Sequence, residues 1–114
     1  MAILQEGKHA AEFVLYDEGT YSRDQVTISS TAGALVPGTV LGKVTATGEY
    51  VAYSNAASDG SEVARAINIY AVPDSTADQK TTVITRAAEV IGSQLTGLDA
   101  AGTADLLAAG IVVR

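Results

Sequence analysis

The side chains that could perform chemistry are few in this sequence. It contains a single His, His9, and no Cys. A zinc site needs several Cys, His or carboxylate ligands, and a Ser-His-Asp triad needs a histidine held between two partners. His9 stands between Lys8 and Ala10, and no such constellation accompanies it. We therefore predict no catalytic residue, no metal site and no cofactor, and we interpret His9 as a solvated or contact-making side chain.

One segment has the appearance of a phosphate-binding loop. Gly38 is followed by Gly42 and Lys43, but three residues separate the two glycines where a P-loop has four. Val44 stands where that loop needs the hydroxyl of a Ser or Thr to bind Mg²⁺. We reject a nucleotide site and predict a turn at Pro37 and Gly38, followed by a strand.

The charged side chains are interpreted as solvated groups. Asp74 and Asp78 lie close together, but in a predicted loop without the apolar surroundings that would shift the pKa of an acid or base. Glu62 with Arg65, and Arg86 with Glu89, are candidates for ion pairs on exposed strands, where such a pair contributes at most about 1 kcal/mol.

The length and composition of the chain predict a single domain that does not bind nucleic acid. It has 114 residues, 47% of them hydrophobic, with five Tyr, one Phe and no Trp. The core must therefore be built from small and β-branched side chains, and stability contributed by partner subunits would be unsurprising. Thirteen acidic against seven basic residues give a net charge of -6, which argues against nucleic acid as a partner. No stretch approaches the length of a membrane span, so we expect no membrane partner and a protein made and kept in a cytoplasm.

The first part of the chain differs in pattern from the rest. Residues 1–23 are predicted to form an extended N-terminal arm, and residues 24–114 a β domain. The alternation of Val26 and Ile28 with polar neighbours marks the first strand of that domain. Within the arm, Phe13 to Tyr16 form a short apolar run with two open interpretations. It is either a strand-adding anchor for a partner or simple edge packing.

The rest of the chain predicts a mainly β fold with one late helix. Strands are expected over 39–46 and 50–53, joined as a hairpin, over 65–72 as a buried strand, and over 81–90. An Ala- and Leu-rich helix is expected over 98–109, with Asp99 or Thr103 as its N-cap and Gly110 after its end. The last four residues, 111–114, are predicted to form a terminal strand that ties the C-terminus into the sheet.

Five segments in order carry a resemblance to a known family. They are Arg23–Ile28, Leu35–Gly42, Asp59–Gly60 leading to Ala66–Tyr70, Arg86–Val90 and Leu106–Arg114. At this chain length the ordered set resembles the lambda-type bacteriophage head decoration protein D family. The resemblance runs from about Arg23 to the last residue.

The resemblance implies a fold, an assembly and a place in the virion. The fold would be a β-clip-like or small β-barrel-like domain with one short C-terminal α-helix and the N-terminal arm. The protein would bind as a homotrimer to the major capsid protein, at three-fold sites on the outer surface of the expanded icosahedral head. It would be assembled in the host cytoplasm and would stabilise the head against internal DNA pressure. In the family the arm becomes ordered on the shell and pairs with capsid-protein strands. Carried onto this sequence, the capsid-binding arm residues would be Ile3, Leu4, His9, Phe13, Val14, Leu15 and Tyr16.

Two other functions remain open at this point. One is a different non-enzymatic phage virion component, such as a head-completion or tail adaptor protein, which would form rings instead of three-fold trimers. The other is a small β-clip-type enzyme, which would need a pocket with convergent polar groups. The symmetry of the oligomer separates the first alternative from a decoration protein.

Overall fold

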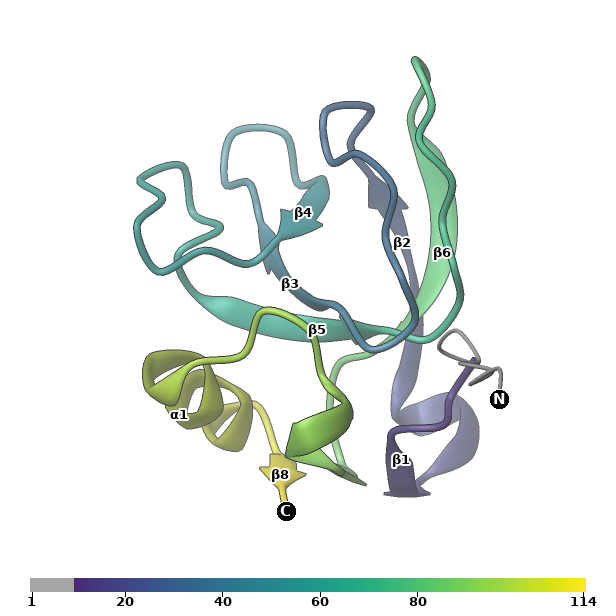
Figure 1. Ribbon diagram of the computed structural model, residues 1–114, viewed down its shortest axis with the longest axis vertical. Helices are drawn as coiled ribbons and strands as arrows, with labels where there is room; N and C mark the ends of the chain where they lie inside the picture. The colour runs from purple at the N-terminus through teal and green to yellow at the C-terminus, as the bar shows by residue number, and fades with distance from the viewer. Residues whose placement is uncertain (1–9) are drawn as a thin grey trace, which may run out of the picture.

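Two β-sheets and one α-helix make up the computed structural model, which describes residues 10–114 (Figure 1). The strands are β1 (Val14–Asp17), β2 (Arg23–Ile28), β3 (Val40–Lys43), β4 (Tyr50–Ala52), β5 (Ala64–Asn68), β6 (Gln79–Ile84), β7 (Ala88–Val90) and β8 (Ile111–Val113). The helices are η1 (Gly19–Tyr21), η2 (Gly92–Gln94) and α1 (Ala100–Ala108), of which the first two are short 3-10 turns. The prediction of a mainly β fold with one C-terminal α-helix is confirmed. Within residues 10–114, no helix has the length and apolar character needed to cross a membrane.

Five strands close into a barrel in the order β2-β4-β3-β5-β6. The barrel closes through β2 and β6, which pair antiparallel from Arg23 opposite Ile84 to Ile28 opposite Gln79. The predicted hairpin is confirmed, since β3 and β4 pair antiparallel with Leu41 opposite Ala52.

The apparent phosphate loop is a turn and a strand. Gly42 lies inside β3, where an added Cβ would come within 2.4 Å of the Ser61 carbonyl oxygen. Gly38 has a φ of +88°, as a turn glycine does. Each glycine therefore has a structural reason of its own, namely a close backbone approach at Gly42 and a left-handed turn at Gly38.

Parts of the barrel wall in β3, β5 and β6 are buried on both faces. Successive residues of a strand point to opposite faces, and here each face has its own apolar cluster. Ile28, Leu35, Leu41, Ala66, Val72 and Val83 fill the barrel interior. The outer cluster lies between the barrel, α1 and the second sheet, and contains Phe13, Val40, Tyr53, Ala64, Ile67, Ile69, Ile84, Ala88, Val90, Leu106 and Ile111. Burial on both faces explains why the segment expected to form a buried strand, 65–72, is almost continuously apolar. The strand is shorter than expected, because β5 ends at Asn68 and Val72 forms only an isolated bridge to Leu35.

The second sheet has the order β1-β7-β8 and lies below the barrel in Figure 1. The middle strand β7 pairs antiparallel with β1 and parallel with β8, so the C-terminus is tied into this sheet as predicted. The helix packs beside β8 and β5. It begins at Asp99, whose Oδ1 accepts the Gly102 amide at 2.7 Å, and Gly110 follows its end with a φ of +90°. The predictions for the cap and for the end of the helix are confirmed.

The prediction of one strand over 81–90 is wrong. The barrel strand β6 ends at Ile84, and β7 begins at Ala88 in the other sheet. Between them Ala87 has a φ of +51°, and its carbonyl accepts a 2.9 Å hydrogen bond from the hydroxyl of the buried Ser22. This turn carries the chain from one sheet to the other, which strand propensity alone does not reveal.

The apolar run near the start of the described chain packs against the domain. Phe13 is 0% exposed within the outer cluster, and β1 pairs with β7. Phe13 therefore agrees with the second interpretation of this run, packing within the domain. The predicted capsid-binding role of the arm stays a prediction, and Ile3, Leu4 and His9 lie outside the described residues.

Candidate functional site

The first candidate surface is the free edge of β1. This strand pairs with β7 along one edge, and among residues 10–114 no strand pairs with the other edge. A bulge between Val14 and Tyr16 leaves Leu15 without a partner, and Leu15 and Tyr16 are 55% and 51% exposed. Val14 is half-buried. An unpaired edge with exposed apolar side chains is the kind of surface to which a partner can add a strand.

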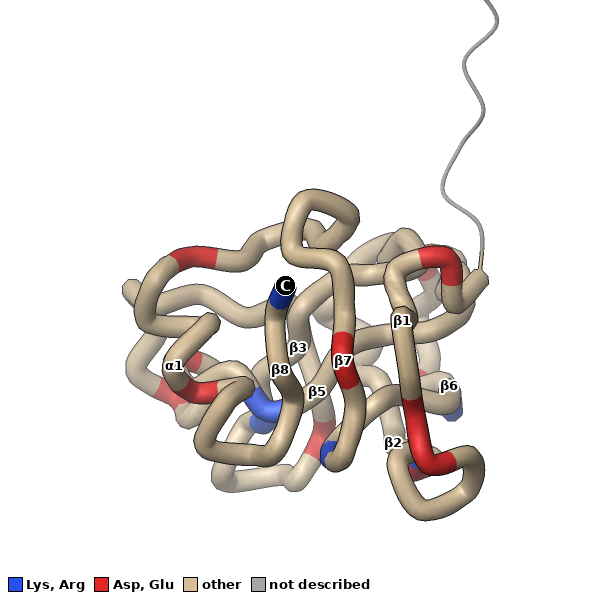
Figure 2. The backbone as a smooth tube through the Cα atoms, turned by 90° about the horizontal axis from the view of Figure 1, so that it is seen from below, with Lys and Arg blue, Asp and Glu red and all other residues tan. Residues whose placement is uncertain are grey.

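Acidic residues lie along this sheet. Figure 2 shows them on β1 and on β7, next to the C-terminal strand. The hydroxyl of Tyr16 donates to the Glu18 carboxylate, and that hydrogen bond raises the pKa of Tyr16. On β7, Glu89 binds Arg114 of the chain end, with 2.6 Å between the guanidinium and the carboxylate. The predicted pair of Arg86 with Glu89 is therefore wrong, because Glu89 has Arg114 as its partner.

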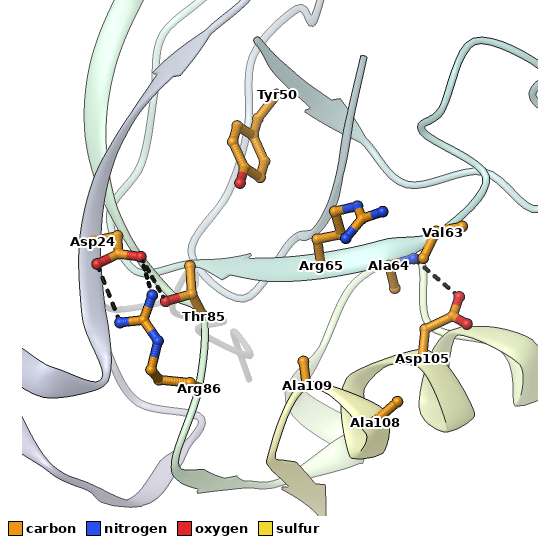
Figure 3. Close-up of a pocket in the computed structure, with 10 residues that line it drawn as sticks. All are labelled: Asp24, Tyr50, Val63, Ala64, Arg65, Thr85, Arg86, Asp105, Ala108 and Ala109. Carbon is orange, nitrogen blue, oxygen red and sulfur yellow. Dashed lines mark hydrogen bonds and ion pairs between the residues drawn. The ribbon is translucent and has the colours of Figure 1, made fainter. Parts of the chain in front are cut away.

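The second candidate surface is a groove of about 370 Å³ between α1 and the barrel (Figure 3). One wall comes from β2 and from the link after β6, the floor from β5, and the far wall from the end of α1. The groove is lined by Asp24, Tyr50, Val63, Ala64, Arg65, Thr85, Arg86, Asp105, Ala108 and Ala109.

An ion pair forms the first wall of the groove. The guanidinium of Arg86 binds both carboxylate oxygens of Asp24, at 2.6 and 3.2 Å, and Thr85 donates to the same carboxylate at 2.9 Å. Arg86 also donates to the Tyr21 carbonyl and lies over the Tyr21 ring, 5.6 Å from its centre. The Arg86 hydrogen bond holds the pKa of Asp24 below its ordinary value. Arg86 is thus engaged by its own chain and links β2 to the crossing between the two sheets.

Arg65 and Tyr50 complete the groove in a different way. Arg65 is exposed on β5 and forms no ion pair within residues 10–114, while Tyr50 is half-buried on β4. Burial raises the pKa of Tyr50. Sequence reasoning named Arg65 only as a candidate ion-pair partner of Glu62, and that pair does not form among the described residues. It did not single out Tyr50. The sequence signal that could have pointed to Arg65 is its charge, because it stands at the start of the run 65–72, whose other residues are mostly apolar.

The groove offers charged groups and hydroxyl groups that can bind a partner. Its carboxylates already accept hydrogen bonds, Asp24 from Arg86 and Asp105 from the Ala64 amide at 3.0 Å. Nowhere in the described part of the chain do three or more metal-ligating side chains come together. Both candidate surfaces are therefore suited to contact with another macromolecule.

Comparison with known families gives a match over nearly the whole chain. A family model described as "Bacteriophage lambda head decoration protein D" matches residues 3–111. A search of curated proteins gives no match. The matched range includes the barrel, β1, β7 and α1, and it ends at the first residue of β8. It begins well before Arg23, where the resemblance carried by the ordered segments starts.

Proposed function

Because the chain belongs to the bacteriophage lambda head decoration protein D family, we propose that it binds the phage head as a homotrimer, at three-fold sites of the expanded shell. The family membership makes it a capsid decoration and stabilising protein, located on the capsid surface of the virion. It is a structural protein and not an enzyme. The small β-clip enzyme and the ring-forming virion component are thereby set aside.

The proposed contact with the major capsid protein is the N-terminal segment together with the free edge of β1. The observation that carries it is the family match, which starts at residue 3 and so includes that segment. Strand addition to an edge derives affinity from main-chain hydrogen bonds and specificity from alternate side chains. The proposed contact residues are Ile3, Leu4, His9, Val14, Leu15 and Tyr16. Phe13 acts indirectly, because it fixes the start of β1 in the core.

The proposed trimer matches the symmetry of a three-fold site. A closed cyclic assembly places one arm of each subunit around the axis. Once one arm has bound, the other two act at high effective concentration, so weak single contacts suffice. The small core and the absence of Cys are consistent with a subunit that gains stability by assembly.

The proposed effect on the head is stabilisation by mass action. A ligand that binds only the intact shell stabilises it by about 2.7 kcal/mol per site at a free concentration one hundred times its dissociation constant. Because many sites are filled on one head, their effects add against a collective rupture of the shell.

Heating genome-filled heads tests this proposal. Heads with and without saturating protein are heated, and the temperature of DNA release is recorded. We expect decorated heads to release DNA at a higher temperature. An unchanged release temperature at full occupancy would show that the protein coats the shell without strengthening it.

A further inference from the structure

The groove contains the one arginine that its own chain leaves unpaired within residues 10–114. Arg23, Arg86 and Arg114 each bind a carboxylate of the same chain at 2.6 to 2.8 Å. Arg65 binds no carboxylate of residues 10–114, although the chain as a whole carries thirteen acidic residues against seven basic ones. Arginine is enriched at protein interfaces, where its planar guanidinium can bind a carboxylate through two parallel hydrogen bonds.

A second free donor lines the same groove as Arg65. The hydroxyl of Tyr50 points into the groove in Figure 3 and has no hydrogen-bond partner among the described residues. The acceptors of the groove are already engaged, Asp24 by Arg86 and Thr85, and Asp105 by a backbone amide. The chemical complement of the two free donors is a carboxylate.

The surroundings of these donors resemble an interface more than an open charged surface. Val63 is 36% exposed on one side, and Ala108 and Ala109 form the end of α1 on the other. A guanidinium and a tyrosine ring bordered by apolar groups have the composition of residues that dominate binding energy in protein contacts.

The groove is separate from the root of the N-terminal arm. The amide of Ala11 donates to the Ile69 carbonyl, just beyond the C-terminal end of β5, whereas Arg65 lies near the start of that strand. Four residues of extended strand span about 13 Å. A subunit can therefore contact the shell at one end of β5 and a different partner at the other end.

We propose that this groove is a contact between subunits of the trimer, in which a carboxylate of a neighbouring copy of this chain binds Arg65 and Tyr50. This inference rests on the proposed trimer. A cyclic trimer needs two different complementary patches on each subunit, and an acidic chain supplies carboxylates to the groove of its neighbour. Each subunit has a net charge of -6, so a buried guanidinium at the contact offsets repulsion between like-charged copies.

Substitution of Arg65 tests the contact. The full-length protein, R65E, Y50F and K80E are compared by sedimentation velocity over a range of concentrations at low and high salt. Lys80 is exposed on β6, so K80E makes the same change of charge away from the groove. We expect a wild-type trimer, a dissociation constant raised roughly thirty-fold or more in R65E, a smaller loss in Y50F, and no change in K80E. Circular dichroism should show all four proteins folded, because Arg65 and Lys80 are exposed.

The possible failures are distinguishable. A wild-type trimer that R65E leaves intact would overturn the groove contact while the trimer stands. If R65E stays trimeric but no longer cosediments with heads, the groove binds capsid protein, and the inference between copies is wrong. A wild-type protein that remains monomeric at every concentration would overturn both the trimer in solution and the contact.

Discussion

The hydroxyl of Tyr53 donates a 2.7 Å hydrogen bond to Oδ1 of Asp99, the same oxygen that accepts the amide of Gly102. Tyr53 follows β4 in the barrel, and Asp99 is the N-cap of α1. The Tyr53 ring can lie close to the first turn of α1 because residue 102 is glycine, where an added Cβ would lie 2.9 Å from that ring. One carboxylate therefore caps the helix and fixes it against the barrel.

Replacement of Asp99 by Ala should lower the melting temperature by several degrees. The change removes both the helix cap and the acceptor of the Tyr53 hydroxyl. Asn retains a side-chain oxygen that can cap, so Asp99→Asn should lose less. Thermal unfolding followed by circular dichroism gives the comparison. Equal stability of wild type and Asp99→Ala would show that the cap contributes nothing.

The free energy of unfolding should depend on pH in two separate ranges, because the pKa values of Asp99 and Tyr53 are both shifted. The Gly102 amide, with help from Tyr53, lowers the pKa of Asp99, so this contribution is present above the ordinary carboxyl pKa and is lost as the pH falls through the lower folded value. Burial, together with the bond to Asp99, raises the pKa of Tyr53 to about 12. The Tyr53 contribution is therefore complete below about pH 10 and is lost as the pH rises towards 12.

Urea unfolding at a series of alkaline pH values tests the second range. Tyr53→Phe cannot ionise, so its free energy of unfolding should fall less than that of wild type above about pH 10. Parallel curves for the two proteins would mean that Tyr53 does not cause the alkaline loss.

Two truncations of different length should distinguish the residues needed for capsid binding from those needed for folding. Deletion of residues 1–9 leaves Phe13 and β1 in place, so the domain should stay folded while attachment to heads is lost. Deletion of residues 1–16 removes Phe13, which is 0% exposed, and most of β1, so it should destabilise the domain severely. Phe13→Ala alone should cost about 3–5 kcal/mol. Pelleting with heads and circular dichroism measure the two effects. Full attachment after deletion of residues 1–9 would refute the arm contact.

Two glycine substitutions should differ sharply. In Gly42→Ala the new Cβ would meet the Ser61 backbone at 2.4 Å, whereas at Gly97, with a φ of +83°, nothing lies within 4 Å. Gly97→Ala therefore suffers backbone strain of about 1–2 kcal/mol, and Gly42→Ala should be more destabilising because β3 and the backbone of Ser61 must move apart. The midpoints of urea unfolding give both values, and a milder effect at Gly42 would contradict the close packing.

The features predicted correctly from the sequence are local ones. Asp99 and Gly110 mark the ends of α1 by the chemistry of their own residue types, and the hairpin of β3 and β4 shows in a short alternation. The break at Ala87 was missed, because its positive φ is imposed by the crossing between two sheets. Barrel closure pairs residues far apart in the chain, as Arg23 with Ile84, which no local pattern encodes.

The candidate surfaces were predicted less well for the same reason. The apolar run that begins at Phe13 was recognised, but alternation cannot say which of its members enters the core. The partner of Arg86 was predicted nearby at Glu89, whereas the fold brings Asp24 to it from another strand. The groove around Arg65 is assembled from five separate segments, so it became visible only with the structure.

A reconstruction of expanded heads incubated with the protein shows where on the shell it binds and in which oligomeric state. We expect density for trimers on the outer surface over the three-fold positions, with each N-terminal segment running along the shell beside β1. Isolated subunits away from those positions, or trimers whose N-terminal segments point away from the shell, would contradict this expectation.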